Sequence, residues 1–417
     1  MNRELSVSIL DQALMSGFSL ALSLVLIALA TPEEFGLFVI VFAAMLIVTA
    51  VQHALINHPL NFLLPGRDAE TQARQLAMLT DMNRPVLWFS LVVAGLAAWM
   101  YATTLTFALA IAFYLFTATV RSYTRDIFIV TGKMTLAFAQ DLVFVLAAVC
   151  SIVLVWRATD PVTAVVTSLG VANLVAMIAF RPAMPRPRGR FIKHLAEYRS
   201  VWVYSRWALL SAMQTETQNR GYIFITEAWK GAATLGMLQV GRMLLAPLML
   251  VTMAWGRIAR PRMVAHLHEG RPREAYAILG GGLVLILGMS VVYGGAVAAC
   301  WTLIEHYIFR ERYGDMSMMA AVWWIYTTLA ALNGCGATLM EAKRAYRALA
   351  MLEMATAATC LTALLSLSLT DLPAISVVIT LAVVQAVYAV GMAVLVVRSE
   401  PGGEARPAAI SESSASL

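Results

Sequence analysis

The stretch DQALMSGFSLALSLVLIALATPEEFGLFVIVFAAMLIV, residues 11–48, contains two long apolar runs separated by a short acidic turn. A run of about 20 apolar residues can cross the hydrocarbon core of a bilayer, roughly 30 Å thick, as an α-helix. The turn TPEEFG at 31–36 is only long enough for a short connection. The stretch therefore predicts two successive membrane-spanning helices.

The composition of the whole chain extends this prediction. Of the 417 residues 60% are hydrophobic and 13% are charged, and the mean hydropathy is +0.75. Soluble domains carry roughly 25% charged residues. We therefore expect an all-α integral membrane protein, with helices and not barrel strands. The formal charge is +6, but the basic residues are spread over short loops, where they indicate topology and not nucleic-acid binding.

Long apolar runs between charged residues or Pro and Gly breaks predict about twelve spans. If the N-terminus is cytoplasmic, the inside segments hold 23 of the 30 basic residues and the outside loops hold four. By the positive-inside rule both termini are then cytoplasmic. The predicted spans are 5–30, 36–63, 85–102, 104–121, 134–156, 161–180, 200–227, 232–258, 276–303, 316–340, 348–369 and 374–397.

A segment rich in proline and arginine divides the spans into two sets of six. We predict an N-terminal six-helix lobe at 1–180, a cytoplasmic inter-lobe linker at 181–199, a C-terminal six-helix lobe at 200–397 and a disordered cytoplasmic tail at 398–417. A weak internal repeat supports the division. LMSG at 14–17 followed by TPEEFG at 31–36 resembles LLSA at 209–212 followed by KGAATLG at 230–236, and many transporters are built from two such repeats.

Several classes of function find no support in the sequence. The four cysteines lie inside apolar stretches without metal-ligand spacing, so neither a disulfide framework nor a metal site is expected. The sequence has no Walker, HExxH, GxSxG or CxxC motif. The longest outside loop, about 304–315, is too short for an extramembrane domain. We therefore expect no catalytic residues and no cofactor.

Polar residues inside the seventh and eighth spans are the strongest functional signal. A charge at bilayer depth costs at least about 2.5–3.5 kcal/mol, so such residues normally face a bundle interior or a wet cavity. Arg220 and Arg242 each lie 11 residues from Gly231, which places both roughly 16 Å from the outer turn, near the midplane. We expect them to share one site.

The segment MQTETQNRGY, residues 213–222, surrounds the first of these arginines. Arg206, Met213, Thr217 and Arg220 fall on one stripe of a helix, which we expect to line an enclosed space. The candidate substrate-binding residues are Arg206, Gln214, Glu216, Gln218, Arg220 and Arg242. Two plainer interpretations stay open. Glu216 and Arg220, four residues apart, could form an ion pair that only locks helices, and Arg206 could reach the headgroups.

The first lobe has its own buried polar residues. Asp11 and Asp141 lie about 10 Å from the inner face by helix rise, where a carboxylate could exchange protons or bind sodium. They could equally pair with Arg121 or Arg125 and be purely structural. His53 is a further candidate for ion coupling, with a satisfied interior histidine as the alternative.

The stretch at 11–48 resembles the first two spans of polysaccharide-repeat flippases in the multidrug/oligosaccharidyl-lipid/polysaccharide exporter superfamily. GAATLGMLQVGRMLLAPLMLVTMAWGRIARPRM, residues 231–263, is similar to the stretch that opens the second lobe of these proteins. The resemblance implies two six-helix lobes around a central cavity, alternating access, and a bacterial inner-membrane location.

The same resemblance implies the cargo and the partners. The cargo would be a polyprenyl-pyrophosphate-linked oligosaccharide moved for exopolysaccharide or O-antigen (lipopolysaccharide) assembly, with membrane lipid and a polysaccharide polymerase or export machinery as partners. Arg220 and Arg242 would hold the pyrophosphate, with Arg206 nearer the entrance. Two alternatives remain: an ion-coupled multidrug or small-molecule antiporter of the same superfamily, and a membrane-embedded glycolipid polymerase.

Overall fold

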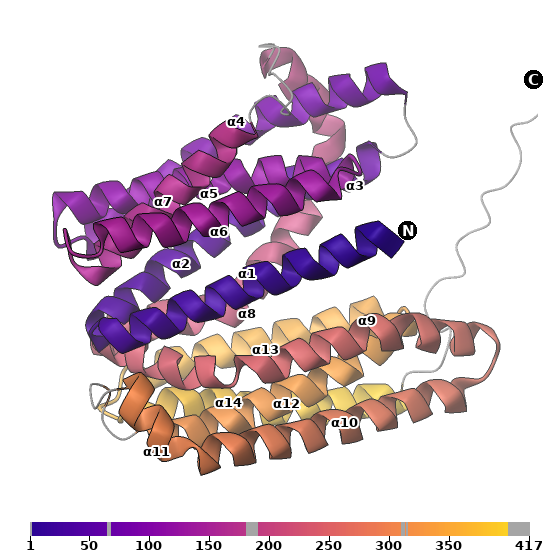
Figure 1. The fold of residues 1–417 in the computed structure, drawn as a ribbon. Helices are drawn as coiled ribbons and strands as arrows, with labels where there is room; N and C mark the ends of the chain where they lie inside the picture. The colour runs from indigo at the N-terminus through magenta and orange to yellow at the C-terminus, as the bar shows by residue number, and fades with distance from the viewer. Residues whose placement is uncertain (1, 65–67, 181–190, 310–312, 314–315, 399–417) are drawn as a thin grey trace, which may run out of the picture. The chain divides into compact units, whose positions relative to one another are not determined.

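The computed structural model describes residues 2–64, 68–180, 191–309, 313 and 316–398, and these residues form helices and no strand (Figure 1). Two short segments are π-helices, η1 and η3. In chain order the elements are α1 Asn2–Leu29, α2 Pro32–Gln52, η1 His53–Asn57, α3 His58–Leu63, α4 Ala69–Tyr101, α5 Leu105–Val130, α6 Met134–Val155, α7 Pro161–Ala179, α8 Phe191–Leu244, α9 Ala246–His268, α10 Pro272–Ala299, α11 Trp301–Ile304, η3 Glu305–Phe309, α12 Ser317–Ala342, α13 Tyr346–Leu367 and α14 Ile375–Arg398.

The helices confirm a multi-pass membrane protein. Within the described ranges, nine helices are long and apolar enough to cross a membrane, or ten if the bent pair α8 and α9 counts as one span. Each of the twelve predicted spans coincides with helical segments, and the eighth, 232–258, crosses the break between α8 and α9. The number of candidate spans is lower than the twelve predicted for two reasons. The helices α8 and α9 are apolar enough only when they are taken together, and the Trp, Tyr, Thr and Asn residues of α12 lower its mean hydropathy.

The acidic turn at 31–36 is the start of α2. The Thr31 hydroxyl accepts a hydrogen bond from the Glu34 N–H at 3.2 Å, and the Glu34 carboxylate accepts one from the Thr31 N–H at 2.7 Å. This capping box satisfies two backbone donors, and Pro32 supplies the fixed φ that suits the first helical position. Side chains also cap α4, α5 and α7, where the caps are Asp68, Thr104 and Asp160.

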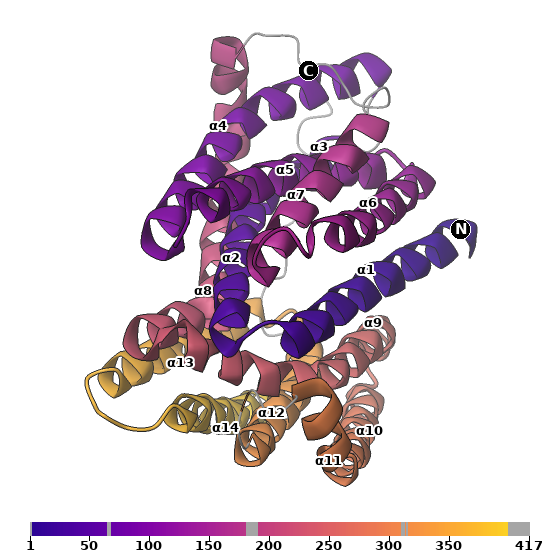
Figure 2. The ribbon, with the colours of Figure 1, turned by 60° about the vertical axis from the view of Figure 1, so that its left-hand side comes forward.

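The chain divides into two compact units. Unit 1 is Met1–Gly236 with Ile308–Arg312, and unit 2 is Met237–Tyr307 with Tyr313–Leu417. In unit 1, α7 packs against α5 and α6, α4 packs against α5, and α1 packs against α6 (Figures 1 and 2). In unit 2, α12 packs against α9, α10 and α14, and α13 packs against α14.

The first segment of unit 1 ends at Gly236, whereas the sequence predicts a second lobe from residue 200, and the division into two six-helix lobes stays a prediction. Residues 191–199 of the predicted linker form the first turns of α8, while 181–190 lie outside the described residues, as does the predicted tail from 399 onward. Tyr198 and Val201 are buried in an apolar cluster with Leu79 and Met82 of α4. The start of α8 therefore belongs to unit 1 by packing.

The two segments of the internal repeat contact each other within unit 1. A Cβ atom on Gly36 would overlap the carbonyl oxygen of Ala232, and a Cβ atom on Gly236 would overlap that of Pro32. The contact is therefore reciprocal, as in a two-fold arrangement. The contacting residues of α8 come directly after Gly231. The φ of 82° at Gly231 breaks α8, and such a φ is easily adopted only by glycine.

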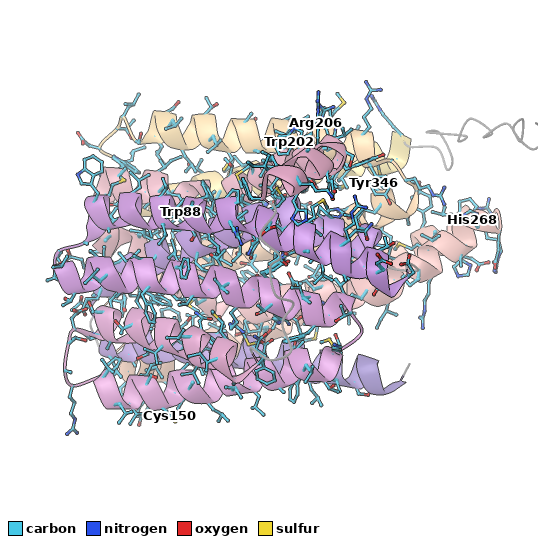
Figure 3. All side chains as sticks on the ribbon, turned by 90° about the horizontal axis from the view of Figure 1, so that it is seen from above. Trp88, Cys150, Trp202, Arg206, His268 and Tyr346 are labelled. Carbon is cyan, nitrogen blue, oxygen red and sulfur yellow. The ribbon has the colours of Figure 1, made fainter. Side chains whose placement is uncertain are left out.

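Large apolar side chains cover the outside of the unit 1 helices. Trp88 on α4 is 70% exposed and Trp202 on α8 is 44% exposed, and both are labelled in Figure 3. A soluble protein rarely exposes contiguous apolar surface of this kind, so the surface is suited to a lipid environment.

Candidate functional site

A buried ion-pair cluster joins α1, α5 and α6. Asp141 is fully buried, and its two carboxylate oxygens lie 2.5 Å from Arg121 Nη1 and 2.6 Å from Arg125 Nε. Arg125 Nη2 lies 2.5 Å from Asp11 Oδ2. A buried charge pair survives only when its partners are in place. The geometry therefore matches the structural alternative for Asp11 and Asp141, in which arginines neutralise them.

The cluster also reaches α7 and the aromatic core. Arg121 Nε donates a hydrogen bond of 2.7 Å to Asn173 Oδ1, and the Arg121 guanidinium lies 3.9 Å from the centre of the Phe144 ring. Arg125 Nη1 lies 3.9 Å from Asp126 Oδ1. Arg125 thus stands between the buried cluster and Asp126.

Asp126 faces a cavity of about 1240 Å³ in unit 1. Three walls form it: the end of α2 with η1 and α3, the end of α5, and the first half of α8. From the α2 to α3 segment come Ala50, His53, Ala54, Asn57, His58 and Asn61; from α5, Asp126, Ile129 and Val130; and from α8, Tyr204, Trp207, Ala208, Ser211, Ala212, Thr215 and Glu216. The lining combines amides, hydroxyls, two imidazoles, the rings of Tyr204 and Trp207, and two carboxylates.

The π-helix η1 presents polar side chains to Asp126. His53 Nε2 lies 3.2 Å from Asp126 Oδ2, and Asn57 Nδ2 donates a hydrogen bond to the same oxygen. In a regular α-helix the Leu55 carbonyl would accept from residue 59, which is proline and has no N–H. The Tyr198 hydroxyl donates to that carbonyl at 2.6 Å. Such π-turns are frequent at functional sites.

Asp126 is a cavity residue that was not predicted from the sequence. The predicted fourth span ends at residue 121, whereas α5 continues to Val130. The residue was therefore assigned to a loop and not weighed as a buried carboxylate. The useful signal was the pair Arg125 and Asp126 next to an apolar continuation, IFIV, that extends the helix.

The wall from α8 is not the predicted stripe. The lining residues recur at Tyr204, Ala208, Ser211 and Thr215, whereas the stripe contained Arg206, Met213, Thr217 and Arg220. At about 100° per residue these two sets lie roughly on opposite sides of the helix. The stripe therefore does not line this cavity, and the enclosed space expected beside it stays a prediction.

Of the predicted α8 residues, Glu216 lines the cavity directly. It forms an ion pair with Arg220, and the side chains of the pair are 16% and 21% exposed. Arg206 is exposed, and its guanidinium lies 5.4 Å from the ring centre of Trp207, which also lines the cavity. Gln214 and Gln218 are half-buried on the same helix and are not among the lining residues.

Arg242 lies in unit 2, in the last turn of α8. There its positive charge interacts favourably with the negative end of the helix dipole. Its guanidinium lies 6.0 Å from the centre of the Trp323 ring. The chain then bends by 49° into α9, where Pro247 stands in the first turn. Because Arg220 belongs to unit 1, a site shared by the two arginines stays a prediction.

The fold is similar to those of solved transporters. An inward-facing multidrug resistance MATE family transporter of the MOP superfamily matches with a TM-score of 0.63 at 13% identity, over 93% of this chain and 96% of that chain. An outward-facing MATE family transporter matches with a TM-score of 0.56 at 12% identity, over 93% and 94%. A MOP superfamily transporter from Pyrococcus furiosus Vc1, with a binding pocket of reverse polarity, matches with a TM-score of 0.54 at 10% identity, over 93% of each chain.

No family model and no curated protein matches the sequence. The likeness therefore shows the fold, which is that of MOP superfamily transporters. It covers nearly the whole chain, including both units.

Proposed function

We propose that this chain is a membrane transporter whose cargo is a lipid-linked oligosaccharide. The observation that carries the proposal is the lining of the unit 1 cavity. Asn57, Asn61, Ser211 and Thr215 offer neutral hydrogen-bonding groups, and Tyr204 and Trp207 offer aromatic faces. Amides and hydroxyls complement sugar hydroxyls, while an aromatic face supplies an apolar contact surface for a sugar ring.

The size of the cavity supports a large cargo. Its volume of about 1240 Å³ exceeds the roughly 300–1,000 Å³ of ordinary small-molecule pockets. The pyrophosphate would be held by arginine, whose guanidinium offers bidentate hydrogen bonds to phosphate oxygens. Arg206 and Arg220 are the candidates in unit 1. Neither lines the cavity, but the side chain of each interacts with a lining residue, Trp207 or Glu216.

A transport assay in proteoliposomes tests this proposal. The measured quantity is the amount of a fluorescent polyprenyl-pyrophosphate oligosaccharide that reaches the opposite leaflet. Replacing Ser211 by Trp should abolish transport because the indole would fill the cavity. Leu210→Trp is the matched control, since Leu210 is 60% exposed and is not a lining residue. Equal transport by both variants, or none by the wild type, would reject the proposal.

An organic-cation exporter is the second candidate. Asp126 and Glu216 place two carboxylates in the cavity lining beside Tyr204 and Trp207, and carboxylates with aromatic faces suit organic cations. Two of the similar structures are multidrug transporters by description. If the chain is such an exporter, a proton or sodium gradient should drive transport of an organic cation such as ethidium. Asp126→Asn and Glu216→Gln should each weaken this transport.

A further inference from the structure

A second hollow in unit 1, of about 590 Å³, lies between the first turns of α8, the middle of α4 and η1. Its lining is apolar or aromatic except for Arg199, and Ile192, Leu195 and Trp202 form its exposed α8 side. We call this hollow the apolar groove. A pocket with so few polar groups is suited to a hydrocarbon chain and not to a polar solute.

The charges beside the apolar groove are unbalanced. Asp81 is fully buried and is engaged by His194 at 2.6 Å and by Arg84 at 3.1 Å. Glu197 is engaged by Arg74 at 2.8 Å. The two acids of this region are therefore neutralised.

The exposed cations Lys193 and Arg199 lie on the same turns of α8. Neither forms an ion pair among the described residues, although Lys193 is close enough to Glu197 to interact with it electrostatically. Arg199 lines the groove and Lys193 does not. The groove thus has a net positive charge at its edge, next to the exposed indole of Trp202. Tryptophan side chains are typical of the membrane interface.

We propose that an anionic phospholipid of the membrane occupies the apolar groove. One acyl chain lies along the apolar lining, and the phosphate is bound by the Arg199 guanidinium. Basic pockets between membrane helices bind anionic headgroups in this way, and arginine matches phosphate geometry.

The bound lipid would contact the same π-helix that carries the cavity lining. Leu55 and Ile56 line the groove, whereas Ala54 and Asn57 line the cavity. Tyr198 also lines the groove and donates its hydroxyl hydrogen bond to the Leu55 carbonyl. Occupancy of the groove would therefore stabilise the contact between η1 and α8, whichever solute the cavity carries.

Lipid binding to the full chain in detergent tests this proposal. Phosphatidylglycerol and phosphatidylcholine with identical acyl chains are titrated, and binding is followed by native mass spectrometry. Both lipids carry a phosphate, but the choline ammonium of phosphatidylcholine cancels its charge, whereas phosphatidylglycerol keeps a net negative charge. The wild type should therefore bind phosphatidylglycerol about fivefold more tightly, as expected for one basic residue that attracts an anionic lipid. R199Q should lose this preference. Ala196→Trp, which fills the groove from an exposed position, should weaken the binding of both lipids.

K193Q is the matched control, because Lys193 is an exposed cation on the same turns of α8 outside the groove lining. It should keep the wild-type preference. Equal affinity of the wild type for both lipids, or an unchanged preference in R199Q, would overturn the proposal. Tight binding of polyprenyl pyrophosphate together with no binding of phosphatidylglycerol would also overturn it, and would assign the groove to the tail of the cargo.

Discussion

At the scale of single residues, Asp141 is the position where two roles can be separated. Its carboxylate is buried and is bonded by both Arg121 and Arg125. Asp141→Asn would remove the negative charge that neutralises these two guanidiniums. Because breaking a buried ion pair costs about 3–5 kcal/mol, we expect a lower free energy of unfolding by this amount. Denaturation in mixed detergent micelles measures it.

The control for Asp141 is Glu197→Gln. Glu197 pairs with Arg74, whose side chain is 67% exposed, and exposed pairs contribute roughly 0–1 kcal/mol. The control should therefore unfold close to the wild type. If Asp141→Asn kept wild-type stability but lost transport, the ion-coupling role predicted from the sequence would be favoured over the structural one.

At the scale of helices, the close approach of α2 and α8 rests on two glycines. Gly36→Ala would place a Cβ against the Ala232 carbonyl, and Gly236→Ala would place one against that of Pro32. Both contacts involve backbone, which cannot rotate away. We expect each variant to lose at least about 1–3 kcal/mol, as for overpacked cores, with a lower Tm of the purified protein.

Gly95→Ala is the matched control for these helix contacts. Gly95 lies inside α4, and an added Cβ there meets nothing within 4 Å. Since alanine favours a helix more than glycine does, the Tm should stay the same or rise. A Tm as low as that of Gly36→Ala would mean that the glycine effect has another origin.

The existence of the helices could be predicted well from the sequence, and their ends could not. Long apolar runs determine a span because only a helix satisfies its backbone in lipid. The ends of α4, α5 and α8 extend beyond the predicted spans, to Ala69, Val130 and Phe191. These extensions contain charged residues whose cost is offset by partners far away in the sequence, such as His194 for Asp81.

The candidate site was predicted only in part, for the same reason. Helical spacing identified the ion pair of Glu216 and Arg220, which the structure contains. It could not show that Asp126 pairs with His53 or which α8 residues line the cavity, because these facts depend on how separate helices meet.

At the scale of the whole molecule, the remaining prediction is orientation. The excess of basic residues in alternate loops predicts that both termini are cytoplasmic. A green fluorescent protein fused after Arg398 should therefore fluoresce, and an alkaline phosphatase fused there should be inactive. Insertion of the phosphatase in the loop between α6 and α7, near Arg157, should give the opposite result. Phosphatase activity at the C-terminal fusion would reverse the topology.

The sequence by itself determined that this chain is a multi-pass helical membrane protein, since hydropathy and length act locally along each span. It also located the repeated turn that begins at Thr31 and at Lys230. Only the tertiary structure decided which carboxylates are neutralised by arginine, which face of α8 borders the cavity and that the repeated turns contact each other. Those facts depend on distances between residues that are far apart in the chain, and helical periodicity carries no information about such distances.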